Sequence, residues 1–291
     1  MTTPKPAAPP DRLVVSVEQR RLALLDVIRG ARARLSLSLF RCNDDAVFAE
    51  LSAATRRGVA VEVLVTSRAK GGRKKIAKLW RALEETGATL HAYTDPVVKY
   101  HAKYLVADEG PAVVASLNFT RKCFRETCDA LVITHDPGVV SGLREVMAAD
   151  RDGRAMPTGL TERLIVGPER ARRQFTALIG GARTSIRLID AKLSDPDLVT
   201  MLNARRTAGL TVEIVSAKRL GDLKSHGKIL LIDDAMVVVG SLALAALSLD
   251  FRREVAITVT EPTAVARAVE LFRSMTGDRP AGGHPPATAA R

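Results

Sequence analysis

The chain has 291 residues, enough for one large domain or two ordinary ones with a full hydrophobic core. Hydrophobic residues make up 46% of the sequence and charged residues 26%, which is the profile of a soluble globular protein and not of a membrane-embedded chain. The net charge of +12 favours a polyanionic partner, either nucleic acid or an anionic membrane surface, although a basic surface also serves solubility.

Both ends of the chain have the composition of disordered segments. The Pro-rich start lacks the apolar core of a signal peptide, so we expect a disordered leader over 1–10 and a disordered tail over 277–291. The most apolar run, 235–249, is short for a membrane span and is interrupted by Gly240-Ser241. It predicts a buried strand followed by a loop, and hence a cytoplasmic protein that is soluble or peripherally bound to a membrane.

The three cysteines are Cys42, Cys123 and Cys128. Their odd number and their spacing do not form a disulfide framework, so we expect free thiols in a reducing compartment. Cys123 and Cys128 have no second Cys/His pair nearby in the sequence. We therefore predict no metal site there.

The first part of the chain alternates between helical and strand-like patterns. Apolar spacing predicts a helix over 18–29, and the segment 34–40 alternates with a period of two, which is typical of a strand with one buried face. Asp44 is placed to cap a helix over 45–57, and 59–66 has the pattern of the next strand. This alternation predicts an α/β unit with a parallel or mixed sheet.

The chain then repeats itself. Segment 11–40 aligns with 162–191 without a gap, at an offset of 151 residues. Such a long match predicts duplication of one structural unit. We expect a first half over 11–149, a linker over 150–161 and a second half over 162–276. Identical residues at this offset include Arg12 and Arg163, Gly30 and Gly181, Gly58 and Gly209, and Glu62 and Glu213.

The first half carries 26 extra residues between 66 and 101, because the offset falls to 125 further along the chain. The insertion predicts a glycine-rich basic loop and a helix over 73–86. It is either a solvated helix face or a functional patch that contacts lipid headgroups or a nucleic-acid backbone. Its cations over 67–81 are Arg68, Lys70, Arg73, Lys74, Lys75, Lys78 and Arg81, with Trp80 among them.

One motif occurs in both halves with identical spacing. It reads His-x-Lys-x4-Asp, with a serine 15 residues after each histidine and an acid 28 residues after it. The first copy contains His101, Lys103, Asp108, Ser116 and Asp129, and the second contains His226, Lys228, Asp233, Ser241 and Glu254.

The residue types suit phosphoryl chemistry. In a strand, positions i and i+2 share a face, so His101 and Lys103 project together, as do His226 and Lys228. If the halves pack with twofold symmetry, two imidazoles and two ammoniums converge on one phosphate. The lysines would then bind its oxygens, one histidine would attack phosphorus, and the other would protonate the leaving oxygen. The two downstream acids would orient the imidazoles.

These motifs resemble those of the phospholipase D superfamily, in which His-x-Lys-x4-Asp followed by Gly-Ser-x-Asn occurs twice. The resemblance covers roughly 11 to 276. It implies two similar α/β halves about a pseudo-twofold axis, an active site at their seam, and a covalent phosphohistidine without metal or cofactor. It further implies His101 as nucleophile, His226 as acid, and structural roles for Asp108 and Asp233. The resemblance also implies phosphate contacts from Lys103, Lys228, Ser116, Asn118 and Ser241.

Three positions depart from the superfamily pattern. Ala115 replaces the Gly before the first serine, Ala243 replaces the second Asn, and Asp129 replaces a Glu. We therefore expect an asymmetric site, with one phosphate hydrogen bond fewer in the second half and a shorter brace for one imidazole.

The substrate class is not fixed by the motif. We favour a phospholipid phosphodiester and a membrane surface as partner, partly because we expect the apolar segment after Ser241 to face acyl chains. A nuclease-like enzyme that acts on DNA or RNA is the alternative, and a noncatalytic polyanion-binding protein is the second alternative. Few aromatic side chains are available to stack on bases, since they make up 4% of the residues. Because both motifs lie in one chain, no obligatory protein partner is expected.

Overall fold

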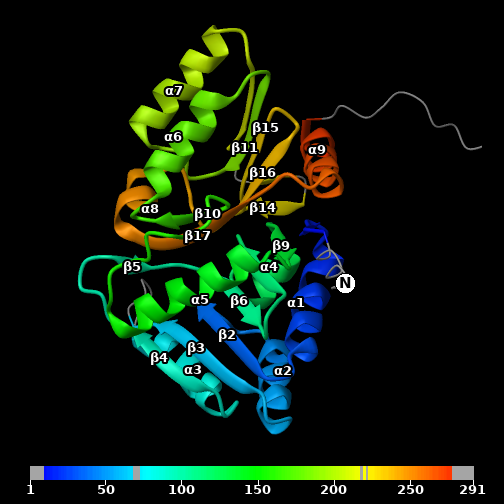
Figure 1. Cartoon of the computed structure of the whole chain (residues 1–291). Helices are drawn as coiled ribbons and strands as arrows, with labels where there is room; N and C mark the ends of the chain where they lie inside the picture. The colour runs from blue at the N-terminus through cyan, green and yellow to red at the C-terminus, as the bar shows by residue number, and fades with distance from the viewer. Residues whose placement is uncertain (1–9, 68–72, 217–218, 221, 277–291) are drawn as a thin grey trace, which may run out of the picture.

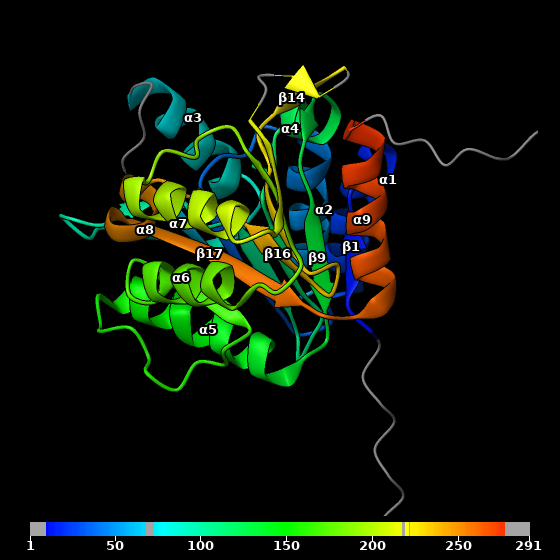
Figure 2. The ribbon, with the colours of Figure 1, turned by 90° about the horizontal axis from the view of Figure 1, so that it is seen from above.

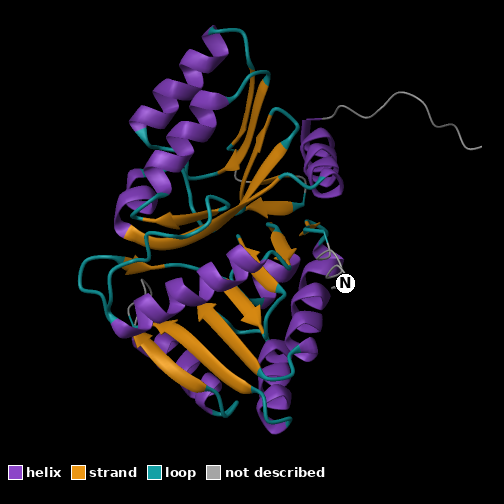
Figure 3. Cartoon of the chain, in the orientation of Figure 1, coloured by secondary structure: helices purple, strands orange, loops and turns teal. Residues whose placement is uncertain are grey.

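The computed structural model describes residues 10–67, 73–216, 219–220 and 222–276. Two α/β halves lie one above the other, the first in blue to green and the second in green to red (Figure 1). Each half has a sheet with helices packed against it (Figure 3). The predicted α/β architecture with two similar halves is therefore confirmed.

The first half contains a seven-stranded mixed sheet. Its strands are β1 (Arg12–Val14), β2 (Arg34–Leu39), β3 (Ala60–Thr66), β4 (Thr89–Tyr93), β6 (Tyr104–Ala107), β7 (Ala112–Ala115) and β9 (Leu131–Thr134). Their order across the sheet is β1-β9-β7-β6-β2-β3-β4. Strands β2, β3 and β4 run parallel, and the other neighbours are antiparallel. The helices of this half are α1 (Val17–Gly30), α2 (Asp45–Arg56), α3 (Arg73–Glu84), α4 (Arg121–Arg125) and α5 (Pro137–Asp152).

In its described residues, the second half repeats this plan without the counterparts of α3 and β4, which account for most of the insertion in the first half. Its main strands are β10 (Leu164–Gly167), β11 (Ser185–Asp190), β12 (Thr211–Val215), β15 (Lys228–Ile232), β16 (Met236–Gly240) and β17 (Arg252–Val259). Their order is β10-β17-β16-β15-β11-β12. The helices are α6 (Ala171–Gly181), α7 (Pro196–Thr207), α8 (Ala246–Phe251) and α9 (Pro262–Thr276).

Two short strand pairs join the halves. Strand β5 (Lys99–Tyr100) of the first half pairs with the start of β17, and β14 (Leu223–Ser225) of the second half pairs with β8 (Thr127–Cys128) of the first. Strand β14 also pairs with β13 (Arg219–Leu220). The two junctions are equivalent under the 125-residue offset. In one, Lys99 pairs with Arg252; in the other, Lys224 (99 plus 125) pairs with Thr127 (252 minus 125). This exchange is what a pseudo-twofold axis between the halves requires.

Three hydrophobic clusters form the core. One packs α1 and α2 on the outer face of the first sheet, and another packs α6 and α7 on the outer face of the second sheet (Figure 2). The third lies between the sheets and takes residues from both halves, including Tyr104 and Val114 from the first and Leu231 and Val255 from the second. Helices α5 and α9 contribute to this central cluster, so each half completes the core of the other.

The cap of α2 agrees with expectation, and the burial of β2 corrects one. The Asp44 side chain accepts hydrogen bonds from the Ala46 and Val47 amides, and thereby caps α2 as predicted. Strand β2, however, is buried on both faces and not on one. Its polar residues are satisfied inside the protein, because Ser36 donates to Glu62 at 2.7 Å and Ser38 lies 2.7 Å from the Tyr100 hydroxyl. The polar residues of the period-two pattern therefore lie on a second face of β2 that is also buried.

Several segments named in the sequence analysis lie partly or wholly outside the described residues. These are 1–9 of the leader, all of the tail 277–291, and Arg68 and Lys70 of the basic loop. Helix α5 extends to Asp152, so the first residues of the predicted linker are helical, and the division into domains stays a prediction. Within the described part of the chain, no helix combines the length and apolar character needed to cross a bilayer.

Candidate active site at the seam between the halves

Both histidine-lysine motifs lie beside the junctions that join the halves. The His101 amide donates to the Arg253 carbonyl at 2.9 Å, and the Gly227 amide donates to the Cys128 carbonyl at 2.7 Å. Each motif is therefore anchored to the backbone of the opposite half. Residues 101–103 link β5 to β6, and residues 226–227 link β14 to β15. Both histidines therefore lie outside the strands, which corrects the strand expectation for both copies.

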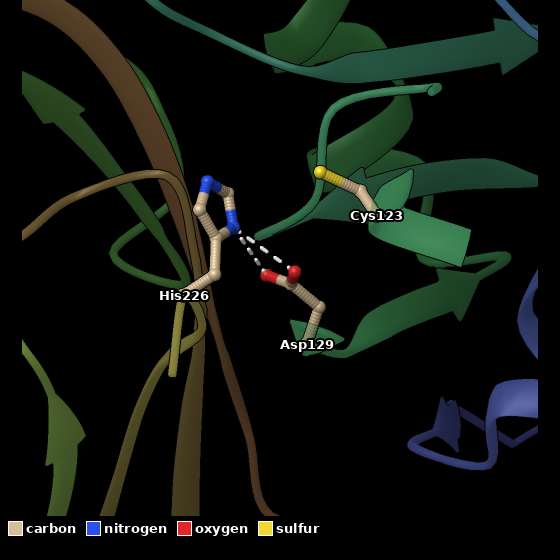
Figure 4. Close-up of side chains that lie close together, drawn as sticks. All are labelled: Cys123, Asp129 and His226. Carbon is tan, nitrogen blue, oxygen red and sulfur yellow. Dashed lines mark hydrogen bonds and ion pairs between the residues drawn. The ribbon is translucent and has the colours of Figure 1, made fainter. Parts of the chain in front are cut away.

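The two acids hold the two imidazoles across the seam. Nδ1 of His101 lies 3.2 Å from Glu254, and Nδ1 of His226 lies 2.9 Å from Asp129. Each histidine thus contacts the acid that belongs to the other copy of the motif. Figure 4 shows the second of these pairs, with Nδ1 of His226 facing both carboxylate oxygens of Asp129. In both pairs the contact at Nδ1 leaves Nε2 available for chemistry.

The lysines lie beside their histidines and are buried. Nζ of Lys103 donates to the His101 carbonyl at 2.5 Å and lies 3.1 Å from Nδ1 of the same ring. Lys228 donates to the His226 carbonyl. The side chains of Lys103 and Lys228 are 1% and 6% exposed, so both charges are largely removed from water. Buried cations of this kind favour an anionic ligand.

Burial and mutual repulsion change how these groups titrate. Burial lowers the pKa of Lys103 to about 7, and the nearby Lys228 ammonium acts in the same direction. Burial, with Lys103 and then Lys228 as further causes, lowers the pKa of His101 to about 3. His101 is therefore neutral near pH 7, as a nucleophile must be. The influence of Lys228 on residues of the first motif also indicates that the two halves share one electrostatic site.

The acids are held by hydroxyl groups. Ser116 and Thr127 each donate to Asp129 at 2.6 Å, and Ser248 donates to Glu254 at 2.8 Å. Burial alone would raise the pKa of Asp129, but the interactions with His226 and Lys228 outweigh it, and the pKa lies below its ordinary value. Asp129 is therefore ionised and accepts the hydrogen bond from Nδ1 of His226.

The aspartates of the two motifs have a different location. Asp108 accepts hydrogen bonds from the amides of 32–34, and Asp233 accepts them from the amides of 183–185. Both have positive φ angles, 43° and 54°, in a turn conformation that Asp tolerates. A strand rises about 3.3 Å per residue, so Asp108 lies roughly 13 Å from Tyr104 at the far end of β6. Both aspartates stabilise turns through these hydrogen bonds and do not contact the histidines.

Comparison with known proteins agrees with this geometry. Residues 24–151 match the family model described as cardiolipin synthase, PLD-like domain. Over 130 residues the chain is 29% identical to cardiolipin synthase A of Pseudomonas aeruginosa, which covers 44% of this chain and 26% of the relative. This part of the chain is therefore a phospholipase D-like domain.

Two solved structures have a similar fold over both halves. Phosphatidylserine synthase of Haemophilus influenzae has a TM-score of 0.69 and 11% identity, and covers 91% of this chain and 85% of that one. Polyphosphate kinase of Porphyromonas gingivalis has a TM-score of 0.71 and 19% identity, and covers 90% of this chain and 50% of that one. At these identities the likeness concerns the fold alone. The chain spans about a quarter of the length of the curated relatives it matches.

The residues that the sequence predicted to bind phosphate fall into two groups. The Ser116 hydroxyl is within 2.6 Å of Asp129, and Ser241 contacts the backbone of Val255, so the two serines hold the framework of the site. Asn118 is 8% exposed, and its Oδ1 has no hydrogen-bond partner among the described residues. Asn118 therefore remains a candidate ligand for the substrate, together with the two lysines.

The segment after Ser241, which we expected to face acyl chains, is buried at its start and exposed at Leu247, which is 44% exposed. Leu242, Ala243 and Leu244 are each 2% exposed and pack in the core of the second half. The same loop supplies the Leu244 amide, which donates to Asp190 at 2.7 Å. The apolar character of 242–244 therefore reflects the core, and a role of the segment at a lipid surface stays a prediction for its exposed part.

Sequence reasoning missed side chains that border the site. The Phe40 ring lies 4.5 Å from the His101 ring and 5.2 Å from Nζ of Lys103, and the Arg41 guanidinium lies 5.2 Å from the same Phe40 ring. The 151-residue offset matches Arg41 with Lys192. Burial, followed by Lys228, lowers the pKa of Lys192, which places it near the second motif. The sequence did contain a signal for these two residues, because Arg41 and Lys192 are cations at equivalent positions after β2 and β11.

Proposed function

We propose that the protein is a phospholipase D-type phosphodiesterase that acts on phospholipid headgroup phosphodiesters, by hydrolysis or by phosphatidyl transfer. The observation that carries this proposal is the crossed arrangement of the two histidine-acid pairs beside two buried lysines. It supplies two imidazoles with different surroundings and two cations at one seam. Those are the groups that a two-step phosphoryl transfer through a covalent intermediate requires.

In the first step, Nε2 of neutral His101 attacks phosphorus. A phosphorus–nitrogen bond forms, the bond from phosphorus to the leaving alcohol oxygen breaks, and Nε2 of protonated His226 gives its proton to that oxygen. Glu254 supports the attack because it accepts a hydrogen bond from Nδ1 of His101, which directs the lone pair to Nε2. Asp129 supports the imidazolium of His226 in the same way.

In the second step, water or an alcohol attacks the phosphohistidine. His226, now neutral, takes the proton from the attacking oxygen, and the phosphorus–nitrogen bond breaks to restore His101. Water gives hydrolysis, and an alcohol gives phosphatidyl transfer. Charge on the nonbridging oxygens is balanced by Lys103 and Lys228. This sequence needs no metal, because the side chains supply nucleophile, acid and positive charge.

Lipid is the favoured substrate because the curated relative with a matching segment is a cardiolipin synthase. The net charge suits any phosphodiester. The exposed basic residues of α3 fit a nucleic-acid backbone as well as lipid headgroups, which keeps a nuclease as the second candidate. They are Arg73, Lys74, Lys75, Lys78 and Arg81.

The test is a substrate panel with a chelator present throughout. Vesicles of phosphatidylcholine or phosphatidylglycerol and plasmid DNA are each incubated with the wild type and with His101→Asn. We expect headgroup release, or transfer to an added alcohol, that depends on His101. DNA cleavage with inert lipid would overturn the lipid assignment. Binding to any of these without turnover would indicate a noncatalytic member.

A further inference from the structure

A thiol lies beside the His226–Asp129 pair. Among the described residues, Sγ of Cys123, a carboxylate oxygen of Asp129 and a ring nitrogen of His226 all lie within 4.8 Å of one another. Figure 4 shows the three side chains facing a common point, with Cys123 on α4, Asp129 just after β8 and His226 from the other half. Cys123 and Asp129 both act on the pKa of Lys103, in the direction that raises it.

The second half has a different residue at the equivalent position. The 125-residue offset that relates the motifs places Ser248 where the first half has Cys123. Ser248 donates a hydrogen bond to Glu254, the acid that contacts His101. The two acid-histidine pairs therefore differ in one neighbour, since one has a hydroxyl group and the other a thiol. A hydroxyl is a poor ligand for thiophilic metals, whereas a thiolate is a strong one.

We propose that Cys123, Asp129 and His226 form an inhibitory site for a thiophilic divalent cation such as Zn²⁺. Thiolate, imidazole and carboxylate are the ligands that Zn²⁺ prefers, and three protein ligands leave a fourth position for water. Ligand distances of about 2.0–2.3 Å put the donor atoms of a tetrahedral site roughly 3.3–3.8 Å apart, so modest side-chain rotations suffice.

Ion binding would change the protonation of the site. The Cys123 thiol releases its proton, and the Nδ1 proton of His226 is lost so that this nitrogen can bind the ion. Asp129 then ligates the ion and no longer accepts the hydrogen bond from Nδ1. His226 becomes a neutral metal ligand that keeps its Nε2 proton, and this proton is far less acidic than that of an imidazolium, so His226 is a poor acid in the first step. The affinity for the ion rises with pH because binding releases protons.

Direct binding is tested with Co²⁺ as the probe. We expect wild-type protein to show a thiolate-to-cobalt charge-transfer absorption, and Cys123→Ser to lose it, with affinity at least about tenfold lower. Cys42→Ser is the matched control, because Cys42 is also buried but lies outside the cluster. The control is expected to keep the absorption. No absorption in the wild type, or equal absorption in Cys123→Ser, overturns the proposal.

The inhibition arm rests on the proposed function, and the binding arm does not. Buffered Zn²⁺ is expected to lower wild-type turnover at least about tenfold at saturation, and a chelator is expected to restore it. Cys123→Ser is expected to keep its turnover in the same buffer, because serine already occupies the equivalent position beside Glu254. Undiminished wild-type turnover in saturating Zn²⁺ contradicts the inhibitory role. If no substrate is turned over at all, the proposed function fails, and the cobalt spectra alone decide the metal site.

Discussion

At the scale of single residues, Lys103 combines deep burial with positive charge. Its side chain is 1% exposed, and burial is the main cause that lowers its pKa. Such a group is retained for function at a cost in stability. Replacing it with an apolar side chain of similar length should therefore stabilise the fold while it removes a phosphate ligand.

We predict that Lys103→Met abolishes turnover and raises the free energy of unfolding by about 1–4 kcal/mol, the range for apolar replacement of buried ionic groups. Urea denaturation measures the second effect. Lys75→Met on the exposed face of α3 is the control, and should change stability by less than about 0.5 kcal/mol. A destabilised Lys103→Met would show that the ammonium supports the fold.

The pH dependence follows from the same lysine. The pKa of Lys103 is lowered to about 7, so the free protein loses this positive charge as the pH rises through neutrality. We expect kcat/KM to fall as the pH rises through about 7. His101, with a pKa lowered to about 3, stays neutral over the same range and adds no acid limb near neutrality.

The control for this profile is Lys103→Arg, because arginine stays charged throughout the range. Whatever its absolute rate, this variant should lose activity less steeply than the wild type as the pH rises through 7, because only the requirement for protonated His226 then remains. An identical limb in both proteins would assign the titration to another group.

At the scale of elements, the junctions that join the halves position the motifs. A Cβ atom on Gly227 would lie 2.5 Å from the Cys128 carbonyl oxygen and 3.3 Å from Cα of Asp129. The backbone next to His226 therefore approaches the opposite half too closely for any other residue. A side chain here would push β14 from β8 and separate His226 from its acid.

We predict that Gly227→Ala lowers turnover at least about tenfold, since small displacements of catalytic groups are costly. The matched control is Gly180→Ala in α6, where an added Cβ meets nothing within 4 Å. The control should keep full activity and gain about 0.5–1 kcal/mol of stability, because alanine favours the helix. Unchanged turnover in Gly227→Ala would mean that the junction tolerates movement.

The sequence was informative at this scale because residues with the same spacing in two copies of a unit occupy equivalent positions in the two folded halves. The identical intervals in both copies were sufficient to select His101, Lys103, His226 and Lys228, and the alternating patterns predicted the strands and helices around them. The crossed partnership of acids and histidines was not predictable from spacing. It depends on how β5 and β14 reach across the axis, which only the packing of the halves determines.

Other features of the site and the fold could not be predicted because they also depend on contacts between distant parts of the chain. Phe40 and Cys123 carry no motif, and their importance comes from contacts with residues far away in the chain. The apolar segment after Ser241 has the same composition whether it lines a lipid site or a core, so only its burial decides. Periodicity identified β2 but could not show that its polar face would also be covered.

At the scale of the whole molecule, the central hydrophobic cluster makes the halves interdependent. It contains residues from both sheets and from α5 and α9, and neither half encloses it alone. We predict a single cooperative unfolding transition, with calorimetric and van't Hoff enthalpies that agree. Two separated transitions in scanning calorimetry would show that each half has a sufficient core of its own.

The central claim is that two crossed histidine-acid pairs act on one phosphorus atom, with His101 as the nucleophile. The most direct test is to quench the reaction on a phospholipid whose phosphate is labelled, digest the protein and map the covalent label. The account predicts label on the peptide that contains residue 101, lost in His101→Asn and accumulated in His226→Asn. Label on the peptide that contains residue 226, or full turnover in His101→Asn, would contradict it.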